Sequence, residues 1–146
     1  MKSITVVSLG PGSREMLTLG ALEAMKKAEK LVLRTGRCDA AVYLRENGVS
    51  FDTLDNLHET CEDFDELCAE AAARLKGLAE KSRVCYAVLD AAADETVSAL
   101  QAEVSLTVLP GVPLSAPFLS ALPQEKVEVQ TASRLELTGV QNPLLI

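Results

Sequence analysis

The chain has 146 residues, the length of one ordinary domain with room for a sizeable core. Its net charge of −7 excludes the surplus of Lys and Arg that meets nucleic-acid phosphates, and the absence of Trp removes the best platform for stacking bases. No apolar run approaches the roughly 20 residues that cross a bilayer, and nothing resembles a signal peptide. We therefore expect a cytoplasmic protein without nucleic-acid or membrane partners.

The first predicted element is an apolar, β-branched strand over residues 4–9, which runs directly into Gly10, Pro11 and Gly12. Apolar side chains then recur at helical spacing over residues 17–28, which predicts an amphipathic helix. A buried strand followed by a glycine turn and a helix is typical of the start of a parallel α/β domain.

Strands and helices then alternate as far as residue 122. Strands are predicted at residues 30–33, 49–54, 83–89 and 105–109, and helices at residues 40–46, 63–81, 95–103 and 115–122. This alternation predicts an α/β domain over residues 1–122, with a mostly parallel sheet flanked by helices on both faces. Residues 123–146 change pattern and end in an apolar run, so we expect a linker and the first strand of a truncated second domain.

The clearest predicted helix, residues 63–81, carries many acidic residues near its start. Its apolar face is formed by Phe64, Leu67, Cys68, Ala71, Leu75 and Leu78. The acids therefore fall on the solvent side or at the helix cap, where Asp63 and Glu66 fit a capping box. They are Glu59, Glu62, Asp63, Asp65, Glu66 and Glu70. We predict no metal site there, and the four cysteines, which form no Cys-x-x-Cys pair, indicate none either.

Three loops rich in glycine or alanine are predicted at one edge of the sheet, because parallel strands share their carboxyl edge and ligands bind outside it. They are residues 10–13, 89–94 and 110–113. The first is not a dinucleotide fingerprint, since Glu15 stands where the third glycine would be and Pro11 lacks an amide donor. Arg34 also follows a strand and either contacts an anionic ligand or is an ordinary loop charge. No nucleophile–base pair is visible, so acyl transfer is not expected.

Several segments, in a fixed order, resemble the tetrapyrrole (corrin/porphyrin) methylases. Residues 4–13 with 17–22 are similar to the family's opening motif, and residues 108–112 to its Pro-Gly-Val segment. Residues 30–35, 51–55 and 84–88 more specifically resemble the methylase-like domain that precedes a MazG nucleotide pyrophosphohydrolase. Residues 143–146 resemble the strand that opens the family's second domain. The resemblance thus covers nearly the whole chain but only the family's N-terminal half, as in a fragment of a MazG-type protein.

This resemblance implies the N-terminal domain of a class III S-adenosylmethionine-dependent methyltransferase. It implies S-adenosylmethionine as cofactor, a tetrapyrrole-like small molecule as acceptor, a homodimer, and a nucleotide pyrophosphohydrolase as a fused or separate partner. The positions that match the family's cofactor-binding loops, here called the cofactor edge, are Leu89, Asp90, Ala91, Ala92, Pro110, Gly111 and Val112. The acceptor side is formed by Gly10, Pro11, Gly12 and Arg34. The catalytic residues stay unassigned, and positioning of donor against acceptor would supply much of the catalysis.

Two departures from the family's pattern leave an alternative open. Residues 89–94 contain neither glycine nor proline where the family has Gly-x-Pro, and Pro113 stands where the family prefers Ser. A Cβ at a glycine position can collide with a cofactor or forbid the needed backbone angle. The alternative is a non-catalytic module that binds a nucleotide-like ligand or a partner and regulates an attached hydrolase. A magnesium-dependent pyrophosphatase would need carboxylates facing inward from paired helices, which the pattern of residues 63–81 does not provide.

Overall fold

The computed structural model describes residues 3–121, 128–129 and 144–145, and within them five strands form one sheet. The strands are β1 (Ile4–Ser8), β2 (Lys30–Leu33), β3 (Asp52–Thr53), β4 (Val84–Val88) and β5 (Leu106–Leu109), in the spatial order β3-β2-β4-β1-β5. Every pairing in this sheet is parallel, which confirms the predicted α/β class. The first strand along the chain thus lies between β4 and β5.

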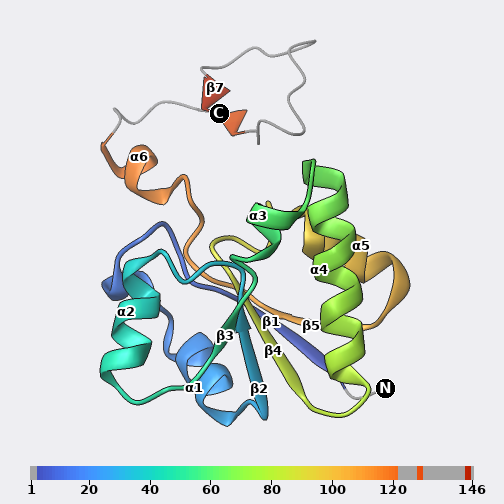
Figure 1. The fold of residues 1–146 in the computed structure, drawn as a ribbon. Coiled ribbons are helices and arrows are strands. Elements are labelled where there is room, and N and C mark those ends of the chain that lie inside the picture. Colours follow the sequence, from blue (N-terminus) through green and yellow to red (C-terminus); the bar gives the residue numbers. More distant parts are fainter. Residues whose placement is uncertain (1–2, 122–127, 130–143, 146) are drawn as a thin grey trace.

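Helices cover both faces of the sheet (Figure 1). One face packs against α1 (Leu19–Lys27) and α2 (Asp39–Glu46), the other against α4 (Phe64–Ala79) and α5 (Glu95–Glu103). Alternate residues of each central strand enter the two cores, so that Val6 and Tyr86 face α4 and α5 whereas Val7 and Cys85 face α1 and α2. Because β4 is buried on both faces, its sequence is an unbroken apolar run.

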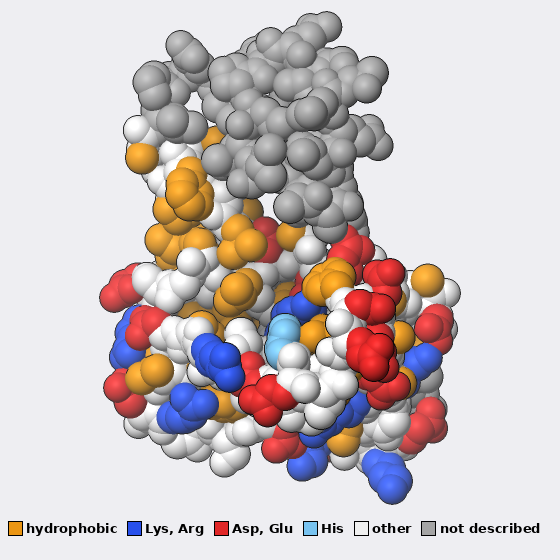
Figure 2. All heavy atoms as spheres, turned by 45° about the horizontal axis from the view of Figure 1, so that its top comes forward, with side chains coloured by type: hydrophobic (Ala, Val, Ile, Leu, Met, Phe, Trp, Pro, Cys, Tyr) orange, Lys and Arg blue, Asp and Glu red, His pale blue; other side chains and the backbone are white. Residues whose placement is uncertain are grey.

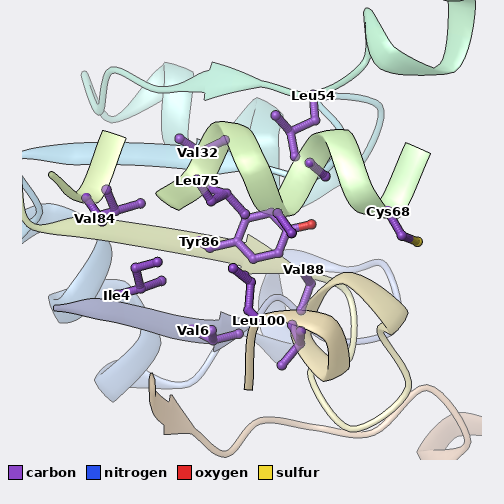
Figure 3. Packing of buried hydrophobic residues seen from close by; sticks show 14 of the residues in the cluster. Ile4, Val6, Val32, Leu54, Cys68, Leu75, Val84, Tyr86, Val88 and Leu100 are labelled. Carbon is purple, nitrogen blue, oxygen red and sulfur yellow. The ribbon is translucent and has the colours of Figure 1, made fainter. Parts of the chain in front are cut away.

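Tyr86 is the largest fully buried side chain in the described part of the chain, and its ring packs among Leu75, Val88 and Leu100 (Figure 3). Cys68 and Cys85 are both buried and both free. Burial raises the pKa of the Cys85 thiol to about 12. These two cysteines therefore behave as small apolar core residues.

The start of α4 confirms the predicted cap and corrects one expectation. The Asp63 carboxylate accepts a hydrogen bond from Glu66 N at 2.8 Å, and the Glu66 carboxylate accepts one from Glu62 N at 2.6 Å. Phe64 was expected on the buried face, but half of it is exposed. It is the first residue of α4, beside the carboxyl edge of the sheet, and its ring centre lies 5.9 Å from the guanidinium carbon of Arg34 rather than in the core.

Several predicted elements are shorter in the structure, and others are additional. The helix expected from residue 17 begins at Leu19 after the Thr18 cap, and is preceded by a 3-10 turn, η1 (Arg14–Met16). The strand expected at residues 49–54 is reduced to β3, whose register pairs only two residues with β2. A short helix, α3 (Leu57–Thr60), occupies a stretch where the sequence predicted neither helix nor strand.

Three further described elements follow the edge strand β5 along the chain. Helix α6 (Ala116–Ala121) has no buried residue, and Phe118 within it is exposed. Two short strands, β6 (Glu128–Val129) and β7 (Leu144–Leu145), pair in parallel with each other. The boundary predicted at residues 122–123, and most of the segment after it, lie outside the described residues. No helix in the described ranges combines the length and the apolar character that crossing a membrane requires.

Candidate functional site

The turn after β1 lies directly beside the loop after β4. Leu9 N donates a hydrogen bond to Val88 O at 2.7 Å, and Gly10 N donates one to Leu89 O at 3.0 Å. The ladder between β1 and β4 therefore continues past both strands. As a result, two of the three predicted ligand loops leave the sheet side by side.

The turn itself depends on glycine at two positions. Gly10 and Gly12 have φ angles of 84° and 137°, which side chains with a Cβ rarely adopt. A Cβ on Gly10 would also lie 3.2 Å from both the Cβ and the carbonyl oxygen of Met16. The Gly-Pro-Gly segment thus redirects the chain from β1 into η1. Gly12, at the exposed end of this turn, has open space around it.

A cavity of about 410 Å³ lies at the same edge, between the loop after β4, the loop after β5 and helix α5. It brings together five of the residues predicted for the cofactor edge: Asp90, Ala91, Ala92, Pro110 and Gly111. Leu89 instead packs against the apolar cluster on the opposite face of the sheet, and Val112 is half-buried. The two loops predicted to share a ligand therefore do share one cavity.

Ser8, the last residue of β1, forms the floor that joins these loops. It is only 5% exposed, and its hydroxyl oxygen accepts a hydrogen bond from Ala91 N at 3.0 Å. A Cβ on Gly111 would lie 2.6 Å from the Ser8 Cβ and 3.2 Å from the Ser8 carbonyl oxygen. Only glycine therefore lets the Pro-Gly-Val segment lie this close to the end of β1.

Asp90 links the two loops through its carboxylate. Its Oδ1 accepts a hydrogen bond from Ala92 N at 3.0 Å, and its Oδ2 accepts one from Leu114 N at 3.2 Å. The first bond closes the loop after β4, and the second crosses to the segment after β5. Among the described residues that line the cavity, Asp90 is the one with a charged side chain.

Arg34 leaves the same edge of the sheet, but its guanidinium is engaged within the chain. Its Nη1 lies 3.0 Å from Asp94 Oδ2 and 3.2 Å from Thr96 Oγ1, and 18% of its side chain is exposed. Burial alone would lower the pKa of Arg34, but the Asp94 carboxylate raises it above its ordinary value. Asp94 also accepts a hydrogen bond from Val97 N and so caps α5. Arg34 thus joins β2 to the start of α5, and its predicted contact with an acceptor stays a prediction.

The six acidic residues around the start of α4 are all exposed, as predicted. Figure 2 shows acidic side chains gathered on the right of the molecule, where α4 lies in Figure 1. No group of three or more metal-ligating side chains in metal-binding proximity occurs among the described residues. The acids of α4 therefore form a solvated face there.

A family model described as Tetrapyrrole (Corrin/Porphyrin) Methylases matches residues 3–140. The chain belongs to the tetrapyrrole methylase family. It is 32% identical over 85 residues to the uncharacterized protein YabN of Bacillus subtilis (strain 168), a match that covers 58% of this chain and 17% of YabN.

The sheet and helices also match a solved structure, that of a putative cobalamin synthesis related protein (CobF) from Corynebacterium diphtheriae. The TM-score is 0.59 at 18% identity, and the match covers 88% of this chain and 63% of that one. At this identity the likeness shows the fold alone. The chain spans about a sixth of the length of YabN and less than two thirds of the CobF chain.

The loop at residues 89–93 contains no glycine and shows no backbone strain. No non-glycine residue in the described part of the chain has a positive φ angle, so Asp90 and the three alanines after it adopt ordinary conformations. The hydrogen bonds made by Asp90 and Ser8 stabilise the loop in this form. A ligand at this edge would meet small alanine side chains.

Three polar residues that line the cavity were not predicted from the sequence: Ser8, Ser98 and Gln101. Ser8 had a usable signal, because it is a polar residue at the carboxyl end of an otherwise apolar, buried strand. Ser98 and Gln101 carried no such signal. They lie on an amphipathic helix, and only the packing of α5 beside the loop after β5 brings them to the cavity.

Proposed function

We propose that this domain binds S-adenosylmethionine in the cavity beside Ser8 and Asp90 and takes part in methyl transfer to a small tetrapyrrole-like acceptor. The observation that carries the proposal is that two segments far apart in the chain, residues 90–92 and 110–111, line one cavity at the carboxyl edge of a parallel sheet. Its volume, about 410 Å³, lies within the usual range for small-molecule sites.

The lining fits the proposed cofactor. Ala91, Ala92 and Pro110 offer small apolar surfaces for the adenosine, and Ser8 and Gln101 add polar groups. When bound, the cofactor supplies a methyl group on a sulfonium, whose bonding electrons return to sulfur as the methyl leaves. This chain would contribute by fixing the donor's position, since a near-attack geometry alone lowers the barrier substantially.

Calorimetric titration with S-adenosylhomocysteine tests this proposal. We expect micromolar binding to the wild-type chain and at least a tenfold loss in Gln101→Trp, whose indole would fill the cavity. Ala102→Trp, on the exposed side of the same helix, is the matched control and should bind as the wild type does. Binding that is absent from the wild type, or unchanged in Gln101→Trp, would contradict the proposed site.

We further propose that the domain belongs to a longer protein of the MazG-associated type. The three segments that resemble the MazG-associated methylases support this, as does a match confined to 17% of the longer YabN. An antibody against this domain should detect a band larger than the chain, and immunoprecipitation should recover nucleotide pyrophosphohydrolase activity. A band of the chain's own size without that activity would contradict the fusion and leave only a separate partner to consider.

The alternative, a non-catalytic regulatory module, is favoured by one feature. The Asp90 carboxylate takes two backbone amides, Ala92 N and Leu114 N, that a bound ligand could otherwise use. Under this alternative neither S-adenosylmethionine nor S-adenosylhomocysteine would bind, and the domain would instead bind a nucleotide-like ligand or a partner and regulate an attached hydrolase. The same titration therefore separates the two functions.

A further inference from the structure

We infer that Asp90 makes this cavity selective for cationic ligands, so that it holds S-adenosylmethionine more tightly than the neutral product S-adenosylhomocysteine. The inference rests on the proposed function, because it concerns the same cavity. It adds a specificity-determining residue and a reason for product release.

The Asp90 carboxylate has a fixed position at the cavity wall. Its two oxygens are held by Ala92 N and Leu114 N, at 3.0 and 3.2 Å, from loops on either side. The residue is only half-buried, so part of it remains exposed. Because each carboxylate oxygen can accept more than one hydrogen bond, these contacts leave acceptor capacity for a ligand.

Nothing among the other described lining residues neutralises this charge. Their side chains are those of Ser, Ala, Gln, Val, Leu, Pro and Gly. Arg34, the cation that follows β2, is paired with Asp94 at 3.0 Å and does not line the cavity. The described lining thus presents one negative charge and no positive charge.

The negative charge of Asp90 has opposite effects on a nucleotide and on S-adenosylmethionine, the two kinds of ligand considered for this domain. The phosphates of a nucleotide would be repelled, whereas the sulfonium and ammonium groups of S-adenosylmethionine would be attracted. After methyl transfer the sulfonium becomes a neutral thioether and loses its share of this attraction. Unit charges a few ångströms apart near a protein surface interact strongly enough for roughly a tenfold difference in affinity.

Calorimetry with S-adenosylmethionine and S-adenosylhomocysteine on the wild-type chain and Asp90→Asn tests the inference. We expect the wild type to prefer S-adenosylmethionine by roughly tenfold, and the variant to bind the two with nearly equal affinity. Asp65→Asn changes the net charge equally but lies on α4, outside the cavity, and should keep the wild-type preference.

Ionic strength provides a second measurement that needs no variant. Added salt should weaken wild-type binding of S-adenosylmethionine more than that of S-adenosylhomocysteine, because it screens the carboxylate. If both ligands bind with equal affinity and equal salt dependence, the inference is wrong while the proposed function stands. If neither ligand binds, the proposed function fails and the inference fails with it.

Discussion

At the scale of single residues, Gly111 allows the segment after β5 to lie against the end of β1. The space that a side chain would need is taken by Ser8, whose hydroxyl also holds the loop after β4. Two residues distant in the sequence thus position both loops of the cavity. This makes the contact a site where one added methyl group has a large effect.

Gly111→Ala is therefore expected to destabilise the domain by about 1–3 kcal/mol, since its Cβ would lie 2.6 Å from the Ser8 Cβ and backbone would have to move. Urea unfolding followed by circular dichroism measures this change. The Gly111→Ala substitution should also weaken binding of S-adenosylhomocysteine, because the backbone movement it causes displaces the cavity wall.

Gly77→Ala is the matched control, since Gly77 lies within α4 and a Cβ there would meet nothing within 4 Å. We expect this variant to be as stable as the wild type or up to about 1 kcal/mol more stable. If Gly111→Ala and Gly77→Ala changed the free energy of unfolding equally, the contact with Ser8 would not be the cause of the destabilisation.

At the scale of secondary-structure elements, Arg14 joins the turn after β1 to α2. Its backbone N and its Nη2 donate hydrogen bonds to the Asp39 carboxylate at 2.9 and 2.8 Å, and its Nη1 donates one to Glu46 at 2.7 Å. These bonds from Arg14 hold the pKa of Asp39 below its ordinary value of 3.8. The contact holds η1 against α2, and so fixes the direction in which the chain leaves the Gly-Pro-Gly turn.

Because the pKa of Asp39 is lower in the folded chain, its ionised form stabilises the fold above the ordinary pKa, and this stabilisation disappears as pH falls through the folded value. Arg14→Gln should lower stability only slightly at pH 7, since both partners are partly exposed. The difference from the wild type should shrink at about pH 3, as measured by urea midpoints.

Lys27→Gln serves as the comparison, because Lys27 and Glu23 form an exposed pair at 3.7 Å. We expect this substitution to change stability little at either pH. An Arg14→Gln effect that is the same at both pH values would contradict a role for the Asp39 charge.

At the scale of the whole molecule, the order β3-β2-β4-β1-β5 places β4 at the centre of the sheet. It pairs with β2 and β1, and all five of its residues are buried. The edge strands differ from it, since β3 has two residues and β5 has exposed side chains. Local opening should therefore be easiest at the edges.

Hydrogen exchange followed by mass spectrometry should show the slowest exchange in Val84–Val88, with faster exchange in Asp52–Thr53 and Leu106–Leu109. Binding of S-adenosylhomocysteine should slow exchange at residues 89–93, beside the cavity. If β4 exchanged as fast as β3, the central position of β4 would not control the stability of the sheet.

The sequence by itself determined the features that depend on near neighbours. Apolar periodicity predicted the helices and the buried strands. Asp63 was correctly predicted as a cap, because a cap contacts amides two or three residues away. The sequence also predicted which loops meet, because parallel strands share one carboxyl edge. The shared cavity of Asp90 and Gly111 follows from that rule.

Only the tertiary structure decided contacts that depend on the spatial order of the strands. That β1 lies between β4 and β5 brings Ser8 against Gly111, and the packing of α5 brings Asp94 to Arg34. The same packing leaves Phe64 half exposed, although helical periodicity placed it on the apolar face. Periodicity along one element cannot specify these outcomes, because each depends on where another element ends.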